Sequence, residues 1–79
     1  MQHARPDYVG RIIDLHGKIP EDEPVFLVRG QDACAPATMR FWAAENNRRG
    51  GNPVFSNQLV EHALRCEEWQ RTHVCKLAD

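Results

Sequence analysis

The fold is decided by the stretch Asn46-Asn47-Arg48-Arg49-Gly50-Gly51-Asn52-Pro53, which separates two segments with a helical pattern. Gly50 and Gly51 are typical of a helix end, and the basic residues before them suit a C-terminal turn. Asn52 is a favoured N-cap residue, and Pro53 is favoured at the first helical position. Because two glycines leave no room for another element, we predict an antiparallel helical hairpin.

The second helix is predicted to run from Pro53 to about Thr72. Side chains recur there at steps of four, three, four and three residues, the spacing of one helix face. We expect this face to be an apolar seam in which the histidine is a core residue and the cysteine a small buried hydrophobe. Glu61–Arg65 and Glu67–Arg71 are expected ion pairs one turn apart. The seam consists of Phe55, Leu59, His62, Cys66 and Trp69, widened by Val60, Ala63 and Leu64.

The first helix is predicted to begin at Pro36 and to end before the glycine pair. A start at Ala33, capped by Asp32, is the alternative. It would place Pro36 where its missing N–H is needed, and proline also disfavours helical angles at Ala35. We therefore expect a shaped turn before Pro36. The expected core stripe is Ala37, Phe41 and Ala44, flanked by Met39 and Trp42.

Two strands are predicted before the helices. Val25-Phe26-Leu27-Val28 is an unbroken apolar run with β preference, which indicates burial on both faces, one of them against a partner subunit. The second strand is the partly alternating segment 8–15, which Gly10 weakens. Residues 1–6 have no pattern and are expected to be flexible. The prediction is an α+β fold: a short N-terminal β-hairpin followed by the helical hairpin, in one domain covering residues 1–79.

Length and cysteine usage limit the ways in which this chain can be stabilised. A domain of 79 residues buries only roughly 60% of its unfolded surface. The odd set Cys34, Cys66 and Cys75, with no apolar leader at the start, predicts a reducing cytoplasmic location. Metal ligation is not expected, because Cys66, His73 and Cys75, with His62 one turn earlier, lack paired zinc spacing. We predict no metal and no cofactor, and self-association as the added source of stability.

Charge and hydropathy argue against duplex nucleic acid and against a membrane as partners. Ten basic and eleven acidic residues give a formal charge of −1, which is not typical of a general duplex-binding protein. No apolar run approaches the ~20 residues that a membrane-spanning helix needs. A local basic site remains compatible with this composition.

The junction between the predicted strand Val25–Val28 and the first helix is the candidate ligand site. A glycine before a helix N-terminus can present free N–H groups to phosphate or carboxylate. Arg29 lies beside it, and Arg40 is a candidate to complete the site with bidentate hydrogen bonds. The alternatives are that Asp32 already occupies the amides and that Arg29 pairs with Glu21 or Glu23. The predicted ligand-binding residues are Arg29, Gly30, Gln31, Asp32 and Arg40.

Three other features are candidate contact surfaces. Arg48 and Arg49 form a basic end that is either a solvated helix C-terminus or a phosphate-binding patch. The acidic loop Glu21-Asp22-Glu23 lies between prolines and is expected to be exposed, because paired-carboxylate chemistry would need an opposing acid. Trp42 is either a core anchor or, if exposed, a contact residue. We find no nucleophile with an orienting base and predict no enzyme activity.

The segment from Ile19 to about Ala44, with Pro24-Val25-Phe26-Leu27-Val28-Arg29-Gly30-Gln31-Asp32 at its centre, resembles small accessory proteins of phages and prophages. The resemblance implies a stoichiometric antagonist of a host defence system. The first expectation is therefore a non-catalytic homo-oligomer that sequesters an anionic, nucleotide-like ligand. The alternatives are an inhibitor of the anti-CRISPR type that covers a protein surface, and a structural accessory protein without a ligand.

Overall fold

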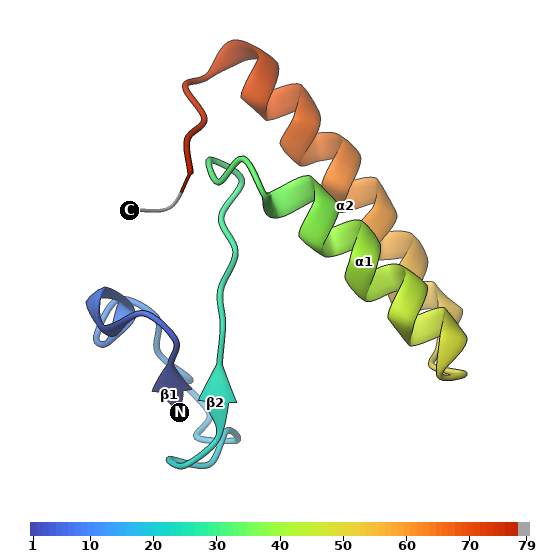
Figure 1. Cartoon of the computed structure of the whole chain (residues 1–79). Coiled ribbons are helices and arrows are strands. Elements are labelled where there is room, and N and C mark those ends of the chain that lie inside the picture. Colours follow the sequence, from blue (N-terminus) through green and yellow to red (C-terminus); the bar gives the residue numbers. More distant parts are fainter. Residues whose placement is uncertain (78–79) are drawn as a thin grey trace.

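The computed structural model describes residues 1–77. Two short strands precede two helices, so the predicted α+β class is confirmed. The helices lie side by side, whereas the strands lie apart from them and are reached through an extended segment (Figure 1). The elements are β1 (Gln2–His3), the 3-10 turn η1 (Pro6–Tyr8), β2 (Pro24–Val25), α1 (Ala35–Arg48) and α2 (Pro53–Thr72).

The helix boundaries follow the predicted capping residues closely. The first N–H of α1 to bond within the helix, that of Thr38, donates to the Cys34 carbonyl at 3.0 Å, so the helix starts one residue before Pro36. Gly50 follows α1 with a φ of 78°, a left-handed conformation that favours glycine. The Asn52 side chain accepts from the Val54 N–H at 3.0 Å and caps α2, whose first residue is Pro53.

The connection between the helices is fixed by the side chain of Asn46. Its Nδ2 donates to the Asn52 carbonyl at 3.0 Å and to the Ser56 hydroxyl at 2.8 Å. Ser56 is 1% exposed, so this contact satisfies a buried polar group. Gly51 donates its N–H to the Asn46 carbonyl at 2.8 Å and packs so closely that a Cβ there would collide with the Asn46 amide.

The core between α1 and α2 is built from small and flexible side chains. Ala35 and Met39 of α1 pack with Ala63 and Cys66 of α2. Val28 and Leu59 pack against this cluster from its edge. The alanines let the helices approach closely, and Met39 fills the remaining space.

The predicted core stripe of α1 is wrong. Ala37, Phe41 and Ala44 are all exposed, and the Phe41 side chain is 71% exposed. The buried face instead runs through Ala35, Met39 and Ala43, which also recur at helical spacing. Both sets contain two alanines at helical spacing, and the buried set has the flexible Met39 where the exposed set has the aromatic Phe41.

The predicted seam of α2 is correct for Leu59 and Cys66 and wrong for its aromatic and histidine members. Cys66 is buried and Leu59 packs on the core, whereas Phe55, His62 and Trp69 are exposed along one flank. The buried face is rotated toward Ser56 and Ala63. The buried face of α2 therefore includes a polar side chain, Ser56, which hydrophobic spacing alone does not identify.

The predicted β-hairpin is wrong in its strands and in its pairing. β1 and β2 are parallel, with Gln2 opposite Pro24 and His3 opposite Val25. β1 therefore lies within the segment 1–6, which has no pattern in the sequence. No strand covers residues 8–15, because Gly10 takes a φ of 83° and the Tyr8 carbonyl accepts from the N–H groups of Arg11 and Ile12 in a turn.

The apolar run Val25–Val28 is not buried on both faces within this chain. Val28 packs against the helical core, whereas Phe26 is 64% exposed. Only Val25 belongs to a strand. The partner subunit expected to cover the second face stays a prediction.

Candidate functional site

The junction before α1 is a compact turn in which Asp32 takes the role that an anion was expected to take. Asp32 Oδ1 accepts from the Cys34 N–H at 2.8 Å. The Asp32 N–H donates to the Arg29 carbonyl, and the Ala35 N–H donates to the Asp32 carbonyl, both at 2.9 Å. The Asp32 carboxylate therefore occupies one amide before α1, as the alternative of internal capping expects, although no side-chain hydrogen bond caps the helix at its N-cap residue Cys34.

Two segments from the far end of the chain hold this turn in place. Gln70 of α2 donates through Nε2 to the Gly30 carbonyl at 2.8 Å and to the Asp32 carbonyl at 2.9 Å. The chain after α2 returns, so that the Lys76 N–H donates to the Gln31 carbonyl at 2.9 Å. The Lys76 carbonyl accepts from the Ala33 N–H at 2.8 Å. Figure 1 shows this return of the C-terminal segment toward the residues before α1.

Arg29 and Arg40 have different surroundings, and only Arg29 belongs to the junction. Arg40 donates to Glu67 through both terminal nitrogens, at 3.1 and 2.5 Å. These hydrogen bonds raise the pKa of Arg40 and lower the pKa of Glu67. Arg40 is therefore paired with Glu67 and does not line the pockets beside the junction. Within residues 1–77 Arg29 makes no ion pair, so the expected pairing with Glu21 or Glu23 is not found there either.

A pocket of about 310 Å³ lies between the junction and the exposed flank of α2, and we call it the junction pocket. Its lining includes two guanidinium groups, a histidine and an indole, and no carboxylate among the described residues. Arg65, like Arg29, has no ion-pair partner within residues 1–77, so the expected Glu61–Arg65 pair does not form. The lining residues are Arg29, Gly30, Gln31, His62, Arg65, Cys66 and Trp69.

The junction pocket unites three of the predicted ligand residues with four residues of α2 that are not in the predicted set, among them the buried Cys66. Arg29, Gly30 and Gln31 were expected at a ligand site. The sequence pattern instead predicts His62 and Trp69 in the core seam and Arg65 in a surface ion pair. Their spacing of three and four residues places them on one helix face, and that signal was present in the sequence. The same spacing also predicts a core seam, because this face contains apolar residues as well.

A second pocket of about 170 Å³ lies against the N-terminal segment, and we call it the arginine pocket. Arg5 and Arg11 lie over the Tyr8 ring at 5.2 and 5.3 Å from its centroid. Asp7 accepts from Arg5 at 3.0 and 3.1 Å and lies 4.0 Å from Arg11, so part of the positive charge is neutralised. Arg29 lines both pockets.

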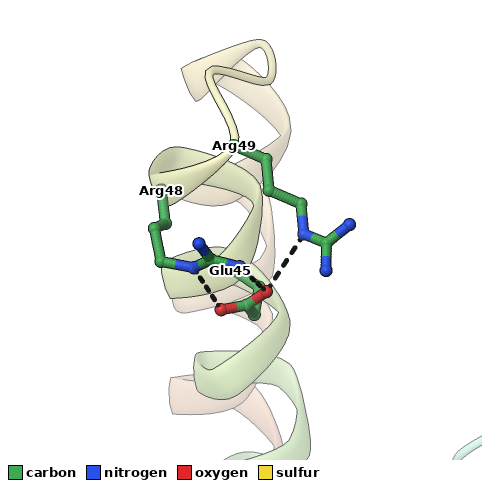
Figure 2. Close-up of polar contacts among 3 residues, drawn as sticks. All are labelled: Glu45, Arg48 and Arg49. Atoms are coloured by element: carbon green, nitrogen blue, oxygen red, sulfur yellow. Dashed lines mark hydrogen bonds and ion pairs between the residues drawn. The ribbon is translucent and has the colours of Figure 1, made fainter.

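The predicted basic end of α1 is paired within its own helix. Glu45 accepts from Arg48 at 2.7 and 2.9 Å and from Arg49 at 3.1 Å (Figure 2). These hydrogen bonds lower the pKa of Glu45 and raise the pKa of Arg48. Because Glu45 is shared by Arg48 and Arg49, the three side chains together carry a net charge of +1. This smaller positive charge weakens the alternative that the helix end is a phosphate-binding patch.

The other predicted contact residues are exposed. Glu21, Asp22 and Glu23 are all exposed, and the Glu23 carbonyl accepts from the Gln2 N–H at 2.8 Å. Trp42 is exposed on α1 and, with Phe41 and Arg49, lines a shallow groove. These features are surface groups on opposite parts of the chain and do not form one site with the junction.

The cysteines and histidines are dispersed. Cys66 is buried beside Met39, whereas Cys34 and Cys75 are exposed, and all three are free thiols. Within residues 1–77 no three His, Cys, Asp or Glu side chains gather as metal ligands. Neither helix of this part of the chain has the length and apolarity needed to cross a membrane.

Comparisons with protein-family models, curated proteins and solved structures found no match to this chain.

Proposed function

We propose that the protein is a non-catalytic binding protein that sequesters an anionic, nucleotide-like ligand in the junction pocket. One observation carries the proposal: Arg29 and Arg65 line this pocket, without an ion-pair partner or a lining carboxylate among the described residues. Unpaired guanidinium groups that converge on one cavity attract phosphate, to which arginine donates two parallel hydrogen bonds.

The surroundings of the two arginines favour a ligand that is more than a simple anion. The pocket also contains an indole and an imidazole, which offer flat surfaces for an organic group. Its volume of about 310 Å³ is at the lower end of small-molecule sites. Because Gln70 fixes the neighbouring carbonyls, the turn that carries Arg29 is held in place before the ligand arrives.

Assembly into a homo-oligomer is part of the proposal. The Cα radius of gyration is 14.1 Å, whereas a compact domain of this length is expected near about 12 Å. The extended shape leaves many large apolar side chains uncovered, as expected of a chain that buries them against further copies of itself. These exposed side chains include Val9, Ile13, Leu15, Phe26, Phe41, Val54 and Leu64.

In this proposal the protein acts in the host cytoplasm as a stoichiometric antagonist of a nucleotide-signalled defence. Its effect depends on the concentration of sites and not on turnover. This role agrees with the resemblance of residues 19–44 to phage accessory proteins.

A thermal-shift screen of mono-, di- and cyclic nucleotides tests the proposal. A ligand that binds the native state raises the melting temperature, so at least one nucleotide should stabilise the wild type. Arg29→Ala and Arg65→Ala should each weaken that binding about tenfold or more, because charge-assisted hydrogen bonds contribute roughly 1.5–3 kcal/mol each. Arg71→Ala, outside both pockets, is the matched control and should bind as the wild type does. No shift with any nucleotide would remove the proposal.

A second function is favoured by the groove on α1. Phe41 and Trp42 are exposed beside Arg49, an arrangement that suits a protein contact with aromatic anchors. If the protein instead blocks a host protein surface, a host protein should copurify with the wild type and with Arg29→Ala. It should be lost from a Phe41→Ser/Trp42→Ser variant that remains folded.

A further inference from the structure

Trp69 is an exposed aromatic residue whose ring is held in one orientation by its neighbour. The side chain is 41% exposed and lines the junction pocket. The ring of His73 stacks on the indole at a centroid distance of 4.0 Å and an interplanar angle of 1°. His73 Nδ1 lies 2.9 Å from the Trp69 carbonyl oxygen and 2.9 Å from Thr72 Oγ1, which fixes the imidazole against the end of α2.

His73 covers one face of the indole, and Trp69 remains partly exposed at the junction pocket. Trp69 follows Arg65 by one helical turn, so the indole and the guanidinium lie on the same side of α2. Arg29, on the junction, lines the same pocket. A cationic region and an aromatic surface are therefore adjacent within one cavity.

We infer that Trp69 is the residue on which the base of a nucleotide stacks, and that His73 is a positioning residue that holds the indole for this contact. The inference rests on the proposed function and adds the specificity of its site: the ligand must carry a planar aromatic base besides phosphate. Every nucleobase has a π-face, so the site distinguishes nucleotides from sugar phosphates and not one base from another.

Probes with and without a base separate this inference from the proposed function. AMP, ADP and cyclic di-AMP are compared with ribose 5-phosphate and pyrophosphate by calorimetry on the full chain. The best-binding nucleotide should bind about tenfold or more tightly than ribose 5-phosphate, the range expected from one base–aromatic stack. Equal affinity for ribose 5-phosphate would overturn the inference while the arginine site stands. No binding of any of the five probes would overturn both.

Fluorescence assigns the contact to Trp69. The chain has two tryptophans, so Trp42→Phe leaves Trp69 as the only indole and removes a side chain that lies outside the pocket. The same nucleotide should quench the emission of this variant, and ribose 5-phosphate should not. Unchanged emission at saturating nucleotide would overturn the inference.

Substitutions at the stack complete the test. Trp69→Leu should lose about tenfold in nucleotide affinity and nothing in pyrophosphate affinity, whereas Trp69→Phe should retain most of the nucleotide affinity. His73→Ala should lower nucleotide affinity severalfold and lower the fluorescence anisotropy of Trp69 in the Trp42→Phe background. Circular dichroism and pyrophosphate binding show whether each variant is folded. Equal nucleotide affinity in Trp69→Leu and Trp69→Phe would contradict the assignment.

Discussion

Asn46 donates a hydrogen bond of 2.8 Å to the hydroxyl of Ser56, a residue that is buried at the start of α2. The same nitrogen also donates to the Asn52 carbonyl at 3.0 Å. One side chain at the end of α1 thus satisfies two groups at the beginning of the next helix. This contact converts a flexible glycine connection into a defined turn.

We expect Asn46→Ala to lower the free energy of unfolding by about 1–3 kcal/mol, because it removes the partner of a buried hydroxyl. Urea denaturation followed by circular dichroism measures the change. Asn47→Ala, on the exposed side of the same turn, is the control and should stay within about 0.5 kcal/mol of the wild type. Equal stability of the two variants would show that water replaces the Asn46 amide.

Gly51→Ala should destabilise the chain because its Cβ would displace the Asn46 amide from its acceptors. The expected cost is again about 1–3 kcal/mol, the cost of losing a buried hydrogen-bond partner. In the double variant with Asn46→Ala the two effects should add to less than their sum, because both act on one side chain. Full additivity in a double-mutant cycle would argue that Gly51 is required for another reason.

Truncation should cost much more stability on the buried face of α1 than on its exposed face. Met39→Ala removes a buried side chain and should cost about 2–5 kcal/mol. Phe41→Ser changes an exposed side chain and should cost less than about 0.5 kcal/mol at concentrations where the protein is monomeric. A large loss for Phe41→Ser in dilute protein would mean that the interface lies on the aromatic face.

Acid should weaken the contact between α1 and α2 at Arg40 and Glu67. The Arg40 hydrogen bonds lower the pKa of Glu67 in the folded chain, so the unfolded chain binds a proton more readily. The contribution to stability is therefore complete above the ordinary glutamate pKa of about 4.3. It is lost as the pH falls through the lower folded pKa. Urea midpoints from pH 7 to pH 2 should fall more steeply for the wild type than for Glu67→Gln, and parallel profiles would contradict this account.

Self-association is expected at micromolar concentration, because the exposed apolar side chains outnumber those in the core of residues 1–77. Light scattering on a size-exclusion column should give a mass of at least twice the chain mass of 9.1 kDa. Phe26→Ser and Phe41→Ser test two of the uncovered regions. A constant mass near that of a single chain would contradict the oligomer.

The helices are predicted well from the sequence because single residues determine where they begin and end. Asn52, Pro53 and the glycine pair each impose a conformation that no distant contact needs to supply. The strands were misplaced because β-pairing depends on residues that are far apart in the chain. Gln2 pairs with Pro24, and nothing in either residue indicates the other.

The sequence indicates only part of the lining of the junction pocket, for a related reason. Arg29, Gly30 and Gln31 were identified from the glycine before a helix, which is a local signal. Arg65 and Trp69 come from α2, and their role depends on how far that helix is rotated about its axis. A helix with two possible apolar faces does not specify that rotation until its neighbour is known. Here Ala35 and Met39 of α1 pack against the face that contains Ala63 and Cys66.

The backbone hydrogen bonds between Lys76 and the residues before α1 also determine where the molecule yields under mechanical tension. Two backbone hydrogen bonds tie this residue to Gln31 and Ala33, 45 and 43 positions earlier. The N-terminal end is tied similarly, because Gln2 and Ala4 bond to the Glu23 and Val25 carbonyls. Tension applied to the two termini therefore reaches these short parallel contacts before it reaches the helix interface. Each of these contacts can break without separating α1 from α2. Under tension they should therefore break first and leave the helical hairpin intact.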